Sequence, residues 1–415
     1  MRFRSIALRL PAAVLTAALA MGCSSTTSTS QSASSATAGG VIKIGIDLPL
    51  SGADASTGIP TRNGAVLAVE QANGKGLPGA FKLVAYDLDD AVQGTHDPAQ
   101  GATNTKTFIS DPAVLAMVGP FNSNVAKAEI PLTNDAELVQ ISPSNTNTGL
   151  TVGDAAAKLR TSHPDVNSYF RVCTTDDRQG SAGAQFARKF GFSKAFIVDD
   201  NETYGKGLAD VFEAQFKALG GTVLGHEHLT KGQQDFKALL TKAQSLGPDL
   251  VFYGGTTATG GGLLRKQMAD AGMQSVAYMG GDGISDQEFL TTAGDQANGS
   301  YFTVAAPETS KLPSAKVFIA DYEKRWNSPV GAYSANAYAA ASIEIAAIEQ
   351  AIKADGGKMP ARADVLKFVA ATANFPSPIG KIGFDRDGDT TAPILSLYKV
   401  SGGKAQFVEQ INLKS

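Results

Sequence analysis

The sequence predicts an α/β protein with two similar lobes, each a parallel-rich sheet with helices on both faces. A unit of short apolar strand, polar loop and helix repeats from Val41 onward, and the same rhythm restarts at Tyr169. The chain has 415 residues, too many for one hydrophobic core. Strands that alternate with helices in this way are typical of parallel sheets, because the helices form the crossover connections.

The first run of this rhythm contains four strand patterns. They are VIKIGIDL, FKLVAYDL, VLAMVG and ELVQIS, and the helices between them are expected at about 63–73, from Asp97 and from about Asn122. Asp97 followed by Pro98 is a strong start signal, because Asp caps free helix N–H groups and Pro suits the first turn.

The second run contains five strand patterns and the tail contains three more. The strands are YFRV, KAFIVDD, TVLGHEHL, DLVFYGG and SVAYMGG, with helices expected from Asp177, Tyr204, Gln233 and Gly262. GSYFTV then leads into helices at about 314–326, 334–354 and 362–371, before the strands PILSLYKV and AQFVEQI, joined by a turn at 401–403. We expect the tail helices to return to the first lobe and the last strands to the second.

Residues 1–22 have the pattern of a lipoprotein signal peptide. Three arginines precede an apolar stretch, Leu10–Leu19, that is too short to span a bilayer. LAMGC resembles a bacterial lipobox, although Ala20 stands where Leu is commonest, and predicts lipid attachment at Cys23. Residues 23–40 are nearly all small or polar and predict a tether. The expected location is the cell envelope, outside the cytoplasm, with the membrane anchor on Cys23.

Cys173 is the other cysteine of the chain and would then have no disulfide partner. It follows a strand pattern, which favours a buried, inert thiol over a nucleophile. Charged residues make up 18% of the chain and apolar residues 43%, with no basic face typical of nucleic-acid binding.

Motif searches find none of the common catalytic or cofactor patterns. The sequence lacks a G-x-S-x-G elbow, a P-loop, a dinucleotide fingerprint and an H-E-x-x-H motif, so we expect neither an enzyme nor a cofactor. His226 and His228 alternate along a strand pattern, where a solvated face is favoured over a metal pair. The acidic segment 385–389 lacks the distal Glu of a calcium loop and is interpreted as a turn.

Two polar loops follow neighbouring strands of the first run. The segment Val139–Thr148 ends a strand with uncharged hydroxyl and amide side chains, and the segment Val114–Asn124 has the same design. Each loop alone is typical of an ordinary turn. In a parallel sheet, however, the two strand ends lie side by side, and the second loop leads into a helix N-terminus that attracts a carboxylate. Together they predict a polar ligand site.

From Val41 to the C-terminus the chain resembles the branched-chain amino acid binding proteins, extracytoplasmic receptors of ABC importers with the type I periplasmic binding fold. The resemblance rests on stretches that occur in order along the body. They are IKIGIDLPLSGADASTG with RNGAVLAVEQANGKG, VGPFNSN, ISPSNTN, RVCTTDDRQG, DDNETYGKGLADVF, DFKALLTKAQSLGPDLVFYGG and YMGGDG.

The resemblance implies a set of ligand contacts. Ser123, Ser144 and Thr146 would hold the α-carboxylate of the ligand, because hydroxyls donate hydrogen bonds to it without neutralising it. From the other lobe the family uses an aromatic residue and an acid, which match Tyr204 and Asp282. Asp282 would pair with the ligand ammonium, although Gly-Asp-Gly on its own favours a simple turn.

Departures from the leucine-type receptors indicate a smaller and wetter pocket. Thr57 and Thr256 stand where aromatic side chains are expected, whereas Tyr333 lies where a pocket aromatic belongs. The disulfide of the family is missing, with Asn122 at one of its positions. Asp176 is expected to face the same region, next to a polar part of the ligand.

The resemblance also implies the division of the body. Lobe 1 would comprise 41–173 plus 304–389, and lobe 2 would comprise 174–303 plus 390–415. Three crossings, near Cys173, Thr303 and Thr390, would form the hinge.

Two functions remain open. The first is a monomeric, lipid-anchored receptor that binds a small amino acid or related amide and delivers it to an ABC permease. The alternative is a sensor domain of the same fold that reports its ligand to another membrane partner.

Overall fold

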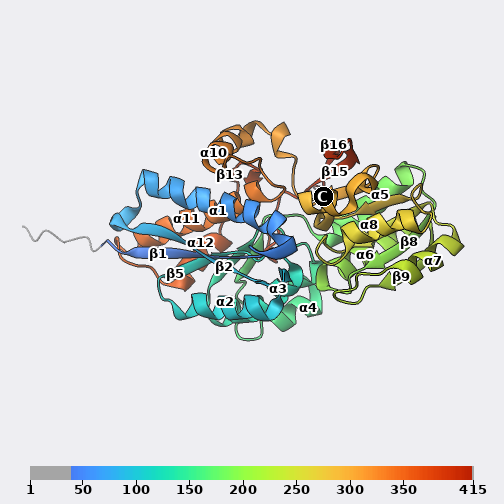
Figure 1. Ribbon diagram of the computed structural model, residues 1–415. Helices are drawn as coiled ribbons and strands as arrows, with labels where there is room; N and C mark the ends of the chain where they lie inside the picture. The colour runs from blue at the N-terminus through green and yellow to red at the C-terminus, as the bar shows by residue number, and fades with distance from the viewer. Residues whose placement is uncertain (1–38, 414–415) are drawn as a thin grey trace, which may run out of the picture. The chain divides into compact units, whose positions relative to one another are not determined.

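The computed structural model describes residues 39–413 (Figure 1). The predicted signal peptide, Cys23 and nearly all of the tether lie outside the described residues. Within 39–413, no helix combines the length and the apolar character that crossing a membrane requires.

The first sheet has five strands, all parallel, in the order β2-β1-β5-β6-β7. The strands are β1 (Val41–Leu48), β2 (Lys82–Asp89), β5 (Val114–Val118), β6 (Val139–Ser142) and β7 (Tyr169–Arg171). Figure 1 shows α1 (Ala55–Lys75) and α11 (Ser334–Ala354) on one side of this sheet and α2 (Pro98–Ser110) and α3 (Ser123–Asp135) on the other. β5 is buried along its whole length because both faces are covered.

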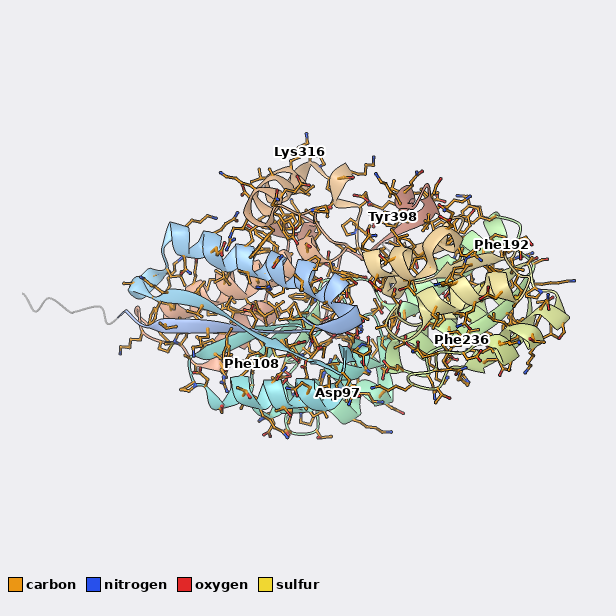
Figure 2. The ribbon with its side chains drawn as sticks, viewed as in Figure 1. Asp97, Phe108, Phe192, Phe236, Lys316 and Tyr398 are labelled. Atoms are coloured by element: carbon orange, nitrogen blue, oxygen red, sulfur yellow. The ribbon has the colours of Figure 1, made fainter. Side chains whose placement is uncertain are left out.

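Packing beneath the sheet is tight around α2. Phe108 of α2 is fully buried, with its ring 5.3 Å from that of Tyr86 (Figure 2). Gly45 makes this possible, because a Cβ at that position would lie 3.0 Å from the Phe108 ring. The predicted cap at the start of α2 is confirmed, since the Asp97 carboxylate accepts hydrogen bonds from Ala99 N and Gln100 N.

The second sheet has seven strands in the order β16-β15-β12-β11-β10-β8-β9. Five of them are parallel: β8 (Lys194–Asp199), β9 (Thr222–His228), β10 (Leu250–Gly254), β11 (Ala277–Gly280) and β12 (Tyr301–Val304). β15 (Ile394–Ser401) and β16 (Lys404–Asn412) add an antiparallel edge. Its helices include α5 (Asp176–Lys189), α6 (Thr203–Ala218), α7 (Lys237–Leu246) and α8 (Gly261–Asp270). The two sheets confirm the predicted fold class.

The C-terminal tail contributes to both sheets. α11 packs against α1, and α12 (Arg362–Ala370) packs against α11 and β5, on the first sheet. The last two strands extend the second sheet, and α10 (Lys316–Trp326) contacts α1.

Several predicted boundaries are wrong. α1 begins at Ala55, well before Asn63, although it contains Pro60, which has no N–H for the helix ladder. Its packing on α11 outweighs that loss. α7 begins at Lys237, four residues after Gln233, whose amide instead bonds the backbone of Thr230 and Asp235 in a turn. The sequence also missed the short helices α4 (Gly153–Leu159) and α9 (Gln287–Ala293), each only seven residues long.

Candidate ligand-binding site

The loops after β5 and β6 are joined by short hydrogen bonds. The Ser144 hydroxyl and the Asn145 amide both donate to the carbonyl of Phe121, at 2.9 and 2.7 Å. Asn147 N donates to Ser123 Oγ at 3.4 Å, and Ser123 is the first residue of α3. The structure therefore brings Ser123, Ser144 and Thr146 together, and all three are buried.

The three hydroxyls differ in whether they can still donate a hydrogen bond to a ligand. The Ser144 hydroxyl already donates its proton to the Phe121 carbonyl, and this hydrogen bond holds the two loops together. Thr146 Oγ1 is buried without a hydrogen-bond partner in residues 39–413, and so is Asn122 Oδ1 at the start of α3. Ser123 Oγ accepts one bond, and no described group takes its proton. Ser123 and Thr146 are thus the better donors for a bound anion.

A second cluster surrounds Asp282, in the turn after β11. Its carboxylate accepts from Gln179 Nε2 at 2.6 Å, from Tyr333 OH at 2.9 Å and from Tyr204 OH at 3.1 Å. Burial raises the pKa of Asp282, and these bonds oppose the increase by favouring the charged form. The structure therefore places three of the predicted residues, Tyr204, Asp282 and Tyr333, in direct contact.

Asp176 interacts with residues of both clusters. It is the first residue of α5, and its N–H donates to the carbonyl of Thr146 at 2.7 Å. It is 1% exposed, and burial raises its pKa well above the ordinary value. Its carboxyl lies near Thr146 Oγ1, but no hydrogen bond of ordinary geometry joins them, and neither carboxyl oxygen has another partner among the described residues. A buried carboxyl without partners is suited to a cationic or hydrogen-bond-donating ligand group.

Thr57 and Thr256 lie apart from these contacts. Thr57 Oγ1 donates to Asp54 O at 2.8 Å, and Thr256 Oγ1 lies 3.2 Å from Thr259 Oγ1. Within residues 39–413, no hydrogen bond joins either threonine to the two clusters. Thr57 does line a cavity of about 230 Å³ together with Tyr333.

Side chains from β4 (Thr95–His96), from α3 and from the loop after β6 also bond residues at the start of α6. His96 is 1% exposed, with Nδ1 2.7 Å from Asp54 Oδ2 and Nε2 2.7 Å from Glu202 Oε2. Asn124 Nδ2 donates to the same Glu202 oxygen at 2.9 Å. Asn147 Nδ2 donates to Thr203 O at 2.7 Å. The loops of the first sheet are therefore held against the helix that carries Tyr204.

The family model for periplasmic binding proteins matches residues 41–404. The chain belongs to this family. The Leu/Ile/Val-binding protein BraC3 of Rhizobium johnstonii is 34% identical over 369 residues, covering 89% of this chain and 94% of that protein. The match confirms the resemblance predicted from the sequence, and membership implies an extracytoplasmic location.

Two solved structures of binding proteins share the fold. They are leucine binding protein LivK from Thermotoga maritima, with a TM-score of 0.77, and LivJ from Streptococcus pneumoniae in complex with isoleucine, with a TM-score of 0.76. Each is 26% identical to this chain, and each alignment covers 90% of this chain and 99% of the other. They confirm the type I periplasmic binding fold.

Sequence reasoning missed Gln179 in this periplasmic binding protein. Gln179 Nε2 donates to Asp282 and also lies 3.1 Å from Thr303 Oγ1. Gln179 stands inside the RVCTTDDRQG stretch that resembles the family. Its partner Asp282 is 103 residues away, so the sequence around Gln179 does not reveal the contact. His96, Asn124 and Glu202 were missed for the same reason, since their contacts join distant parts of the chain.

Replacing His96 by Gln is expected to change the pH dependence of stability. Burial lowers the pKa of His96, but Asp54 and Glu202 outweigh it and hold the pKa well above its ordinary value. The imidazolium therefore stabilises the fold fully below the unfolded pKa of about 6.5 and loses that contribution as pH rises through the folded pKa. The difference in unfolding free energy between wild type and His96→Gln should be largest below pH 6.5 and should shrink at alkaline pH.

Chemical denaturation from pH 6 to pH 10 measures this difference. Asp90 and Asp200 also act on this region, and both remain in the two proteins that are compared. His163→Gln is the matched control, because the hydrogen bonds found for His163 involve only its backbone. A difference that stays constant over the whole range would contradict the ion-pair role of His96.

Proposed function

We propose that this chain is a solute-binding receptor that captures a small amino acid or related amide and delivers it to an ABC permease, without enzymatic activity. The observation that carries the proposal is the Asp282 carboxylate, buried among three hydrogen-bond donors. Asp176, which interacts electrostatically with Asp282, donates its N–H to the loop that carries the Thr146 hydroxyl. An amino acid has the matching charges, an ammonium for one cluster and a carboxylate for the other.

The charges around the site support a ligand that carries a positive group. Asp176 and Asp282 are both buried and act on one another. Arg171, the cation that acts on Asp176, already bonds Asp389 and two loop carbonyls. An ammonium between the two acids would supply the missing charge. Ser123, Thr146 and the first N–H groups of α3 would take the carboxylate.

A hinge between two lobes, 41–173 plus 304–389 and 174–303 plus 390–415, is part of the proposal. The strands of the first sheet end at Arg171, and those of the second begin at Lys194. The three crossings bond one another, since Thr174 N donates to Ala305 O at 3.0 Å and Thr174 Oγ1 to Ile394 O at 2.8 Å. Ligand should therefore close the lobes, and small-angle scattering that is unchanged by saturating ligand would contradict this.

A lipid anchor on Cys23 completes the proposal. It rests on the lipobox-like LAMGC stretch and the short apolar segment before it. Mass spectrometry of membrane fractions should find the mature N-terminus at Cys23 with acyl chains attached. A Cys23→Ala protein that is still cleaved at that position and still bound to the membrane would contradict the anchor.

A thermal-shift screen over amino acids, amides and urea-like solutes tests the function directly. A ligand present at 1,000 times its dissociation constant adds about 4 kcal/mol to the free energy of unfolding. We expect at least one small amino acid or amide to raise the melting temperature of the full chain. A screen without any shift would overturn the proposal.

Ser123→Ala and Thr146→Ala are each expected to weaken ligand binding by about 1.5 to 3 kcal/mol, because each removes a donor to a charged group. This corresponds to roughly ten- to hundredfold in affinity. Calorimetric titration with the solute found in the screen gives the values. Ser181→Ala is the control, since that hydroxyl is exposed and bonds only Asp177 O. Wild-type affinity in both cluster variants would place the ligand elsewhere.

A further inference from the structure

Two histidines and an aspartate meet at the edge of the second sheet. We call Asp199, His226 and His228 the β8–β9 cluster. β9 is the edge strand, and residues 226 and 228 lie on the same face of it, with ring centroids 5.1 Å apart. β8 and β9 are neighbours in the sheet (Figure 1), and Asp199, the last residue of β8, pairs in register with His228. The predicted solvated face is wrong for His226, whose side chain is only 13% exposed.

The ligand-type atoms of this cluster converge. Asp199 Oδ2 lies 2.7 Å from His226 Nε2 and 2.9 Å from His228 Nδ1. One nitrogen or oxygen from each residue lies within 4.8 Å of the others. The Asp199 side chain is fully buried and held by the N–H of Asn201 at 2.8 Å, so the carboxylate has a fixed direction.

A fourth residue orients the more buried imidazole. His226 Nδ1 lies 2.6 Å from Glu213 Oε2, on α6. A neutral imidazole has one N–H, and donating it to Glu213 leaves the lone pair of Nε2 aimed at the Asp199 carboxylate. Two acceptors 2.7 Å apart repel unless a proton or a cation lies between them. The pattern of an imidazole between a carboxylate and a cation is common at metal sites.

We propose that the β8–β9 cluster binds one divalent transition-metal ion of the zinc class, ligated by the Asp199 carboxylate, His226 Nε2 and His228 Nδ1. Imidazole ligands suit zinc, copper and nickel, whereas calcium and magnesium prefer oxygen ligands. The side chain of His228 is 45% exposed, which leaves a path for the ion and a position for water. Glu213 would not contact the ion, but its hydrogen bond with His226 Nδ1 would fix the tautomer of that imidazole.

Binding a zinc ion would require only a small movement of the three ligand side chains. Zinc–nitrogen and zinc–oxygen distances of about 2.0–2.2 Å at a tetrahedral angle place nitrogen and oxygen ligands roughly 3.3 Å apart. The Asp199 oxygens lie 2.7–2.9 Å from the two histidine nitrogens. The side chains would separate by about half an ångström as the ion replaces the shared proton.

Calorimetric titration of the full chain with zinc chloride at pH 7.5 tests the site. We expect one ion per chain, at least tenfold weaker binding in His228→Ala, and binding weakened by about ten- to a hundredfold in Glu213→Gln. His163→Gln is the control and should bind as wild type does. The His228 side chain is 45% exposed, so its replacement should leave the melting temperature without zinc nearly unchanged. A wild-type chain that binds no zinc, or a His228→Ala variant with wild-type affinity, would overturn the proposal.

Discussion

Asp282→Asn is expected to reduce the affinity of this receptor for an amino acid by about thirty- to several-thousand-fold. The substitution keeps the shape of the side chain but removes the charge that would pair with the ligand ammonium. Losing one partner of a buried charge pair typically costs about 2 to 5 kcal/mol, at 1.4 kcal/mol per factor of ten. Asp282 is 5% exposed, so little water would reach the site to solvate the ligand ammonium left without its partner.

Calorimetric titration of Asp282→Asn also separates this role from that of a simple turn residue. A turn role predicts a lower melting temperature with affinity within about threefold of wild type, and that outcome would reject the ion pair. Asp249→Asn is a matched control, because Asp249 caps another strand connection, bonding Ser193 N and Lys194 N at 2.8 and 3.0 Å. It should change stability and leave affinity unaltered.

Most strands of the two large sheets could be predicted because they are apolar runs between turn signals. Buried parallel strands such as β5 and β10 need no partner information to be recognised. The polar loops after β5 and β6 could also be paired, since neighbouring parallel strands end at the same edge. The start of α1 at Ala55 has no clear capping signal, and the sequence predicts a start several residues further along the chain. Packing against α11 determines where this helix begins.

Most individual side-chain hydrogen bonds between distant segments could not be predicted. The bond from Gln179 to Asp282 spans 103 residues, and the one from His96 to Glu202 spans 106. Each residue type is common on exposed helices or turns, so nothing local marks it as buried. The same holds for the β8–β9 cluster. The sequence shows the two histidines on one strand, but their partners Asp199 and Glu213 come from β8 and α6.

Arg171 is the clearest residue whose role the sequence conceals. It ends a short strand pattern, where an arginine usually reaches solvent, yet it is fully buried. Its Nε lies 2.6 Å from Asp389 Oδ1, and Nη1 donates to the carbonyls of Asn145 and Asn147 at 3.0 and 2.8 Å. The guanidinium therefore anchors the loop that carries Thr146 to the acidic turn at 385–389.

Arg171→Met is expected to lower the free energy of unfolding by about 3 to 5 kcal/mol, because it leaves Asp389 without its buried cation. Two loop carbonyls also lose their donors, so the loop around Thr146 should loosen and ligand affinity should fall as well. Urea denaturation measures the first effect and calorimetric titration the second. Arg171→Lys keeps the charge but not the planar fork, and should recover only part of the stability.

Arg160→Met is the matched control for this prediction. Arg160 reaches the same acidic turn, but through a single bond from Nη2 to Asp387 O at 3.2 Å. Within residues 39–413 no hydrogen bond joins Arg160 to the loop that carries Thr146, so its replacement should cost less stability and leave affinity unchanged. If Arg171→Met lost no more stability than Arg160→Met, or bound ligand as wild type does, the guanidinium would not be the anchor of the ligand loop. A large loss of both stability and affinity in Arg171→Met alone would show that the loop depends on this one buried cation for its conformation.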